Sequence, residues 1–287
     1  MRKPKKEIIE KDVKLEIIRD LSNRRKMLVM LAPSFVVNFR YPGIVGQLKK
    51  LGFDKVVELT FGAKMVNKEY HQLLEKNKDS GELVISSVCP GIFETITNKY
   101  PEYAKNLAKI DSPMIATAKI CKKYFPEHKI VFIAPCNFKK IEANKRGYID
   151  YVIDYNELKN ILDKSKAKSE KASFDKFYND YTKIYPLSGG LSRTAHLKQV
   201  LKKGEEKVID GILNVEKFLD NPDKKVRFLD VTYCEGGCIG GPCTPKNLTL
   251  TEKRKLVIKY LEQAEEEKIP EGKLGLIEKA EGLSFEE

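Results

Sequence analysis

The cysteines are the residues of this chain that could most readily do chemistry, because five of the six lie in three short stretches rich in glycine or proline. Cys89 lies in SSVCPG, Cys136 in APCNFKKIE, and three more in YCEGGCIGGPC. Under reducing conditions clustered cysteines indicate metal ligands or catalytic thiols, not disulfides. Four thiolates can hold a tetrahedral zinc ion or an iron–sulfur cluster, and two single cysteines followed by CxxxC fit a cluster better than paired zinc knuckles.

The neighbours of these thiols fit a bulky inorganic group. Pro90 and Gly91 follow Cys89, and glycines that include Gly237 and Gly240 surround the last pair of thiols. Glycine lets the backbone approach such a group closely and point its N–H donors at it. Tight turns alone would also explain these glycines.

A lysine and a glutamate follow the second cysteine at helical spacing. Lys139 stands three residues after Cys136, and Glu142 three residues further on. If this loop opens a helix, the three side chains fall near one face. The ammonium could then reach an anionic ligand while Glu142 neutralises or orients it, although a surface ion pair is the alternative interpretation.

The composition indicates a globular cytoplasmic protein. The chain has 287 residues, of which 41% are hydrophobic, enough to build a substantial core. Met1–Arg25 is charged throughout and lacks the apolar region of a signal peptide, and no apolar run approaches the ~18 residues of a membrane span. The net charge of +12 comes from lysines mixed with acidic residues, which indicates a solvated surface and not a nucleic-acid-binding face. Attraction of an acidic electron carrier is the functional alternative.

Short apolar runs position the cysteines at the ends of expected strands. Runs of this kind alternate with amphipathic segments, which favours a mostly parallel α/β sheet with active loops at the carboxyl ends of its strands. Several of these runs end shortly before a cysteine, so loops far apart in sequence could bring their thiols together. The predicted strands are Met27–Leu31, Lys55–Leu59, Leu83–Ile85, Ile130–Ile133 and Val226–Val231.

Helices are predicted over Asn106–Tyr124, Leu191–Lys203 and Thr251–Lys268. The polar segment Asp163–Lys176 is expected to form a surface loop or an exposed helix that joins two lobes. Cys121 lies on a helical pattern and is expected to be an ordinary core thiol. For Cys243 two interpretations stay open: a solvent-facing or packed thiol, or a thiol with a ligand or redox role.

In combination the three stretches resemble the signature segments of the catalytic domain of iron-only ([FeFe]) hydrogenases, in the family's order. SSVCPG matches a cysteine before Pro-Gly, PCNFKKIE matches PCxxKxxE, and CEGGCIGGP matches CxxxGCxxGG. LAPSF, SPM and SGGL resemble further segments that line the cluster pocket. The resemblance covers roughly Met27 to Pro245, and the three motifs together are specific.

The resemblance implies an H-cluster, in which Cys89, Cys136, Cys234 and Cys238 bind a [4Fe–4S] cubane. Cys238 would also bridge to a [2Fe] subsite with carbonyl, cyanide and dithiolate ligands. It further implies hydrogen or proton chemistry, a ferredoxin or another electron-transfer protein as partner, and maturation proteins that build the cofactor. The residues that the resemblance places around the cofactor are Ala32, Pro33, Ser34, Pro90, Pro135, Lys139, Glu142, Ser188, Gly189, Gly237 and Gly240. Lys139 would hydrogen-bond a cyanide ligand.

Departures from the family pattern concern the proton path. Val88 stands where active relatives usually carry a relay cysteine, and valine cannot carry a proton. Ala108 takes the place of a relay serine, and Glu69 is the single glutamate after FGA. Tyr185 and Pro186 stand where the family usually has Phe-Gly. A positioned acid–base group contributes about 10²–10⁴-fold, so slow or atypical turnover is expected. Thr232 and Met114 stand where a methionine and a glutamine are common.

Three functions follow as expectations: a minimal, ferredoxin-dependent [FeFe]-hydrogenase without ferredoxin-like amino-terminal domains, a hydrogen sensor with the same cofactor, or a [4Fe–4S] protein of cluster assembly. The hydrogenase is preferred because LAPSF and SGGL are retained. The expected fold is α/β, with two lobes of mostly parallel sheets flanked by helices and the cluster buried between them. The expected divisions are a helical extension over 1–26, a catalytic domain over 27–250 with lobes near 27–125 and 126–250, and a terminal helix and tail over 251–287.

Overall fold

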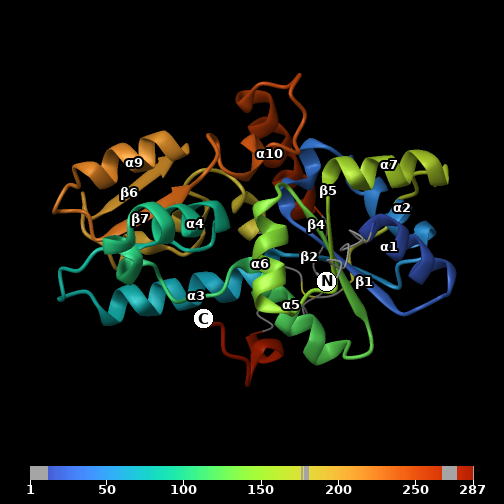
Figure 1. The fold of residues 1–287 in the computed structure, drawn as a ribbon, viewed down its shortest axis with the longest axis horizontal. Coiled ribbons are helices and arrows are strands. Elements are labelled where there is room, and N and C mark those ends of the chain that lie inside the picture. Colours follow the sequence, from blue (N-terminus) through green and yellow to red (C-terminus); the bar gives the residue numbers. More distant parts are fainter. Residues whose placement is uncertain (1–11, 176, 178–180, 267–276, 287) are drawn as a thin grey trace, which may run out of the picture.

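Two parallel β-sheets lie on either side of a shared layer of helices (Figure 1). The structure, a computed structural model, describes residues 12–175, 177, 181–266 and 277–286. Within them the first sheet has the order β2-β1-β4-β5, the second has the order β3-β7-β6, and all neighbouring strands are parallel. The strands are β1 (Met27–Leu31), β2 (Lys55–Glu58), β3 (Val84–Ile85), β4 (Lys129–Ala134), β5 (Tyr151–Asp154), β6 (Glu206–Asp210) and β7 (Phe228–Thr232). The expected α/β class with parallel sheets and flanking helices is confirmed.

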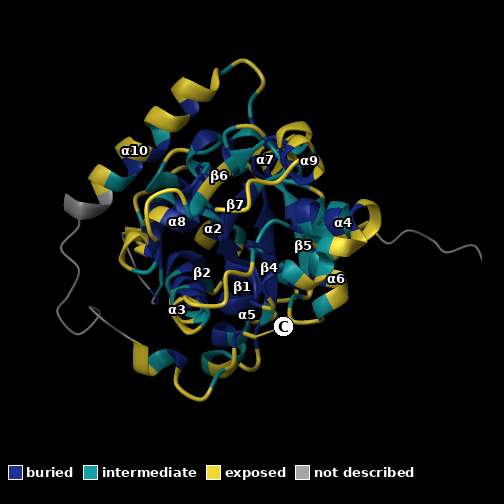
Figure 2. Ribbon diagram, turned by 90° about the vertical axis from the view of Figure 1, so that its left-hand side faces the viewer, coloured by how far each residue is buried: buried dark blue, intermediate teal, exposed yellow. Residues whose placement is uncertain are grey.

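Helices cover both sheets, and Figure 2 shows the strands buried beneath helices with exposed outer faces. Local chemistry fixes several helix ends. Asp154 caps one helix by accepting a hydrogen bond from the backbone of Glu157 at 2.9 Å, and the Glu157 carboxylate accepts one from the Asp154 N–H at 2.7 Å. The helices are α1 (Val13–Ser22), α2 (Gly43–Leu51), α3 (Thr60–Lys76), α4 (Pro90–Lys99), α5 (Pro113–Tyr124), α6 (Phe138–Arg146), α7 (Tyr155–Ser165), α8 (Gly190–Thr194), α9 (Ile212–Asp220) and α10 (Leu250–Glu266).

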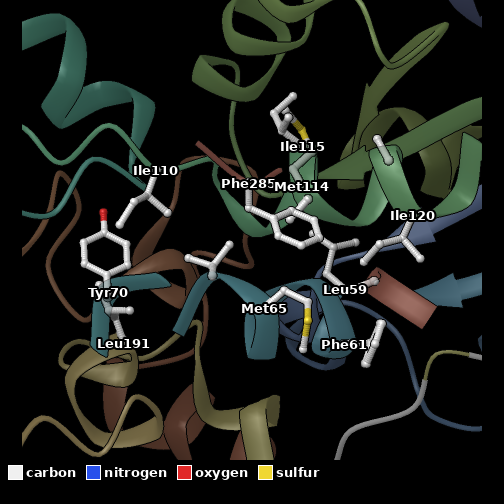
Figure 3. Close-up of a cluster of buried hydrophobic side chains, with 14 of the residues drawn as sticks. Leu59, Phe61, Met65, Tyr70, Ile110, Met114, Ile115, Ile120, Leu191 and Phe285 are labelled. Carbon is white, nitrogen blue, oxygen red and sulfur yellow. The ribbon is translucent and has the colours of Figure 1, made fainter. Parts of the chain in front are cut away.

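Alternation along the strands divides the apolar side chains between layers. In β1, Leu28 and Met30 enter the central cluster, whereas Val29 enters the cluster on the outer face of the first sheet. In β7, Phe228 faces the same central cluster and Leu229 faces the outer cluster of the second sheet. One continuous core therefore joins the two sheets. Figure 3 shows this central cluster, to which α3, α5 and the carboxyl-terminal segment all contribute.

The predicted strands are all present, with ends displaced by at most two residues, but two further strands were missed. The missed strand β5 lies at the edge of the first sheet, and its residue Ile153 is its single fully buried side chain. The missed strand β6 lies at the edge of the second sheet and has no buried residue. Edge strands are half solvated, so their sequences lack a long apolar run.

Two of the predicted helices are wrong in extent. The helix expected from Asn106 begins at Pro113, because the preceding residues form a 3-10 turn and then an extended segment that pairs with Ile85 through Leu107. The helix expected over Leu191–Lys203 is broken into α8 and a 3-10 turn, with His196 in a left-handed conformation (φ 55°) between them. A residue with positive φ ends an α-helix. The terminal helix is confirmed within the described residues as α10.

The two sheets are interleaved in the sequence. The first sheet takes β1 and β2 from residues 27–125 and β4 and β5 from residues 126–250. The segments 27–125 and 126–250 therefore each contribute strands to both sheets, so a lobe boundary at 125 does not match the strand order. Parallel strands need a long crossover connection, and here the connection between β2 and β4 passes through β3 of the second sheet.

The flanking segments are packed onto the domain. Helix α1 buries Ile17 and Asp20 against the first sheet, while residues 1–11 of the expected extension lie outside the described residues. The segment 163–176, expected to be a surface loop or exposed helix, contains the end of α7 and then an extended stretch over its described part. It runs across the outer face of the first sheet, where Ala167 accepts a hydrogen bond from Gln47 at 3.1 Å and Asp175 accepts one from the Val56 N–H at 2.9 Å.

No helix among the described residues combines the length and the apolar character needed to cross a membrane.

Candidate functional site

The carboxyl ends of neighbouring strands carry the predicted ligand loops. In the first sheet, β1 and β4 are neighbours whose following segments lead in opposite directions, and the loops after them carry Ala32–Ser34 and Cys136. In the second sheet, β3 and β7 are neighbours, and the loops after them carry Cys89 and Cys234. Crevices at such points are the usual ligand sites of parallel sheets. The sequence reasoning that placed the thiols at strand ends is confirmed.

The four predicted ligand thiols are electrostatic neighbours. Burial first, and then the nearby thiols of Cys89 and Cys136, raise the pKa of Cys234 to about 12. Burial also raises the pKa of Cys238 far above its ordinary value, with contributions from each of the other three thiols. Cys89, Cys136, Cys234 and Cys238 are half-buried. Four thiolates so close together would repel one another, so deprotonation at this place requires a positively charged group. Four cysteine thiolates are the donors that commonly hold an iron–sulfur cluster, so these residues fit such a cluster.

The thiols are not arranged around one point. Among the described residues, no three His, Cys, Asp or Glu side chains converge closely enough to hold a single metal ion. A tetrahedral zinc site requires four ligands at about 2.0–2.3 Å from one atom. The described thiols therefore do not form a single-ion site of the zinc type.

Glycines let the last cysteine loop pack against two other loops. A Cβ on Gly237, whose φ is 81°, would lie 2.5 Å from the Pro186 carbonyl oxygen. A Cβ on Gly240 would clash with the backbone of Glu235. The Cys238 N–H donates to the Pro186 carbonyl at 2.8 Å. The backbone geometry therefore requires glycine on both sides of Cys238.

The SGGL segment forms the wall next to this loop. Leu187 and Gly237 form an antiparallel bridge, and the Ser188 N–H donates to the Gly236 carbonyl at 3.3 Å. The Ser188 carbonyl accepts a hydrogen bond from the Arg193 guanidinium at 3.2 Å. Gly189 has a φ of 69°, which begins α8 in the left-handed region. The segment thus holds Cys238 in place through its backbone.

Lys139 and Glu142 form the expected ion pair on α6. Their Nζ and Oε2 atoms are 2.6 Å apart, and the two side chains are only 11% and 15% exposed. Burial alone would lower the pKa of Lys139, but Glu142 and the nearby thiols of Cys136 and Cys238 raise it overall. Lys139 also donates to the Val88 carbonyl at 3.3 Å, which connects the second cysteine loop to the first. A charged ammonium is therefore held beside the thiols.

The LAPSF segment approaches the site from the end of β1. Pro33 and Ser34 are buried, and Ala32 is half-buried. The Ser34 hydroxyl lies 2.6 Å from the Tyr155 hydroxyl, and Tyr155 is fully buried. Burial raises the pKa of Tyr155 well above its usual value, and Cys238 contributes to that shift. Tyr155 was missed by the sequence reasoning because nothing in its own neighbourhood distinguishes it.

The relay position is aliphatic. Val88 is half-buried and packs against the central core, and Ala108 is buried with its N–H donating to the Ile85 carbonyl at 2.9 Å. Met114 is a fully buried core residue. Glu69 lies instead in a separate cavity of about 440 Å³ with Lys76, Lys109 and Glu286, and burial raises its pKa. Neither Val88 nor Ala108 can exchange protons.

Other residues that sequence reasoning set aside are mostly accounted for by packing. Cys121 is fully buried in the central core, as predicted. Cys243 is buried in the outer cluster of the first sheet, where burial and Asp154 raise its pKa to about 12. The three histidines lie apart from the thiols: His71 contacts the Ala195 carbonyl, His128 contacts Asp54, and His196 stacks on Tyr181.

Comparisons with known proteins agree with this geometry. Residues 25–242 match the family described as the iron-only hydrogenase large subunit, C-terminal domain. Iron hydrogenase 1 of Clostridium pasteurianum is 29% identical over 73% of this chain and 47% of its own length. The NADP-reducing hydrogenase subunit HndD of Solidesulfovibrio fructosivorans is 24% identical over 90% of this chain and 57% of its own length. The chain thus spans about half the length of these two relatives.

The fold has counterparts among solved structures. One from work on oxygen inactivation of an [FeFe]-hydrogenase superposes with a TM-score of 0.74 at 18% sequence identity, covering 94% of both chains. At this identity the likeness shows the fold, whereas the match over residues 25–242 shows the family. The chain belongs to the family of the iron-only hydrogenase large subunit, C-terminal domain.

Proposed function

We propose that this chain is an [FeFe]-hydrogenase domain that exchanges electrons between H2 and an electron carrier at an H-cluster. The observation that supports this most is the meeting of four thiols from three loops with the Lys139 ammonium beside them. Cys89, Cys136, Cys234 and Cys238 would bind the [4Fe–4S] cubane, and Cys238 would also carry the [2Fe] subsite. When bound, that subsite would supply the chemistry of hydrogen formation and cleavage.

The protein's own contribution would be to hold, orient and enclose the cofactor. Lys139 would donate a hydrogen bond to a cyanide ligand, with Glu142 fixing its position at 2.6 Å. Ser34, backed by Tyr155, would contribute a hydroxyl, and Ala32, Pro33, Pro90 and Pro135 would line the pocket. Ser188, Gly189, Gly237 and Gly240 would bring the backbone close to the inorganic group.

Protons and electrons would travel by different means. Because Val88 and Ala108 offer no exchangeable proton, we propose slow turnover or a proton route through ordered water or Glu69. Electrons would come from a ferredoxin or another acidic carrier, which the net charge of +12 would attract. Assembly of the two-iron part would need maturation proteins. A cytoplasmic location stays a prediction.

One observation keeps a second candidate in view. Val88 removes the usual relay thiol while the ligand cage is retained, a combination that a hydrogen sensor would also use. A cubane-only protein of cluster assembly is the third candidate.

Infrared spectroscopy on protein supplied with the two-iron cofactor tests this proposal. We expect bands from bound carbonyl and cyanide, together with four irons and four sulfides per chain after reconstitution with iron and sulfide alone. A protein that takes up the four irons but never shows those bands would be a cubane-only protein. Hydrogen evolution with a strong reductant then separates an enzyme from a sensor, because a sensor would bind the cofactor without sustained turnover.

A further inference from the structure

Tyr185 carries a hydroxyl that is buried and has no hydrogen-bond partner among the described residues. Its ring packs against the central core. A phenol oxygen buried without a partner is costly and rare, so it indicates a ligand or an ordered water at that place.

Two other buried tyrosines have hydrogen-bond partners within the protein. The Tyr155 hydroxyl is 2.6 Å from that of Ser34, and the Tyr70 hydroxyl accepts a hydrogen bond from the Ser87 N–H at 2.9 Å. Figure 3 shows the Tyr70 ring among the core side chains. Both of these hydroxyls therefore have a partner within the protein, whereas the Tyr185 hydroxyl has none among the described residues.

Tyr185 is fixed next to the cysteine that the proposed function makes the bridge. The residue that follows it accepts the Cys238 N–H through the Pro186 carbonyl at 2.8 Å, and Leu187 forms a bridge with Gly237. A Cβ at Gly190 would come within 2.4 Å of the Tyr185 carbonyl oxygen, so α8 presses on the backbone from the other side. The backbone of Tyr185 is therefore held beside the Cys238 loop.

The electrostatics keep the hydroxyl protonated. Burial raises the pKa of Tyr185 well above its usual value, and Tyr70, Asp230 and Cys238 raise it further. Asp230 accepts a hydrogen bond from the Ser192 N–H at 3.0 Å. A neutral phenol is a hydrogen-bond donor, and the anionic sulfur and cyanide atoms of an H-cluster are acceptors.

We propose that Tyr185 donates a hydrogen bond to a sulfur or cyanide acceptor of the iron–sulfur group held at Cys238. This inference rests on the proposed function and adds to it a contact made by a residue that departs from the family pattern. Hydrogen bonds to cluster sulfurs and ligands set the reduction potential and the electron density at iron. Tyr185 would thus influence the reduction potential of the cofactor, which an apolar side chain at this position could not do by a hydrogen bond.

Tyr185→Phe removes only the hydroxyl, and Tyr103→Phe is the matched control. The Tyr103 hydroxyl donates to the Leu219 carbonyl at 3.0 Å, among residues of the outer cluster of the second sheet. Both variants and the parent chain are reconstituted with iron and sulfide alone for a redox titration followed by electron paramagnetic resonance. A second set is loaded with the two-iron cofactor for infrared spectroscopy.

We expect Tyr185→Phe to shift at least one of these readouts and Tyr103→Phe to shift neither. A more negative cubane potential would place the acceptor on the cubane, whereas displaced carbonyl and cyanide bands with an unchanged potential would place it on the two-iron part. Unchanged potential and bands in Tyr185→Phe, whether or not its melting temperature falls, would overturn the proposal while leaving the proposed function intact. Failure of the parent chain to bind any cluster would overturn both.

Discussion

The two sheets contribute differently to the site. The first sheet and its following helix provide one thiol, Cys136, and the ion pair between Lys139 and Glu142. The Lys139 Nζ and Glu142 Oε2 atoms of this pair are 2.6 Å apart. The second sheet provides Cys89, Cys234 and Cys238, aliphatic side chains, and a single buried carboxylate on β7.

This difference separates two tasks. The second sheet would supply most of the proposed ligand cage, which needs close backbone approach and apolar surroundings, whereas the first would supply the fixed charge that an anionic cofactor needs. Val88 lies next to Cys89, at the position where we expected a relay thiol from the family pattern. The cage can therefore be complete while proton delivery is impaired, and the two properties can be changed independently.

Removal of the proposed bridge should have the largest effect. In Cys238→Ala we expect complete loss of the carbonyl and cyanide bands, because the two-iron part would have no anchor. Cys121→Ala, which removes a thiol from the central core, is the control and should keep the bands. Retention of the bands in Cys238→Ala would show that Cys238 is not the bridge.

Restoring a thiol at the relay position should change activity and leave the cage unaltered. Val88→Cys is expected to raise hydrogen evolution with a strong reductant by about 10²-fold or more, because a positioned acid–base group contributes on that order. Val88→Ala opens the same space without a thiol and should not raise the rate. An unchanged rate in Val88→Cys would mean that protons already travel by another route.

The buried carboxylate of the second sheet should make stability fall with pH. Burial raises the pKa of Asp230 from 3.8 to about 6, so the folded chain binds a proton that the unfolded chain releases between these values. Stability is then lost as the pH rises through this window, by about 2 kcal/mol between pH 4 and pH 7. Asp230→Asn stays neutral and should lack this loss in denaturant titrations at several pH values. Parallel pH profiles of the variant and the parent would contradict the assignment.

Breaking the ion pair between Lys139 and Glu142 should have the smallest effect of these changes. Glu142→Gln leaves the Lys139 ammonium half-buried without its partner, and we expect the free energy of unfolding to fall by about 1–2 kcal/mol. Glu75→Gln, which breaks an exposed pair with Lys78, is expected to change it by less than about 0.5 kcal/mol. Equal effects of the two substitutions would show that the Lys139 pair is no stronger than a surface pair.

Sequence reasoning was most reliable where one local pattern decides the outcome. The run Met27–Leu31 is the strand that was predicted, because all five side chains are buried and read as one apolar stretch. Edge strand β6 was missed because its side chains face solvent, and the helix expected from Asn106 was too long because Leu107 pairs with a strand instead. Propensity cannot register such a tertiary contact.

The sequence by itself determined the class of fold, the thiols to be considered and the spacing that pairs Lys139 with Glu142, since each depends on residues close together in the chain. The tertiary structure alone decided how the strands are shared between the sheets and which side chains surround Cys238. Tyr155 and Tyr185 are separated from it by dozens of residues, and no local pattern distinguishes the phenol that Ser34 satisfies from the one left without a partner. That distinction depends on three-dimensional packing, because a hydrogen bond is set by the relative position of two groups and not by their sequence separation.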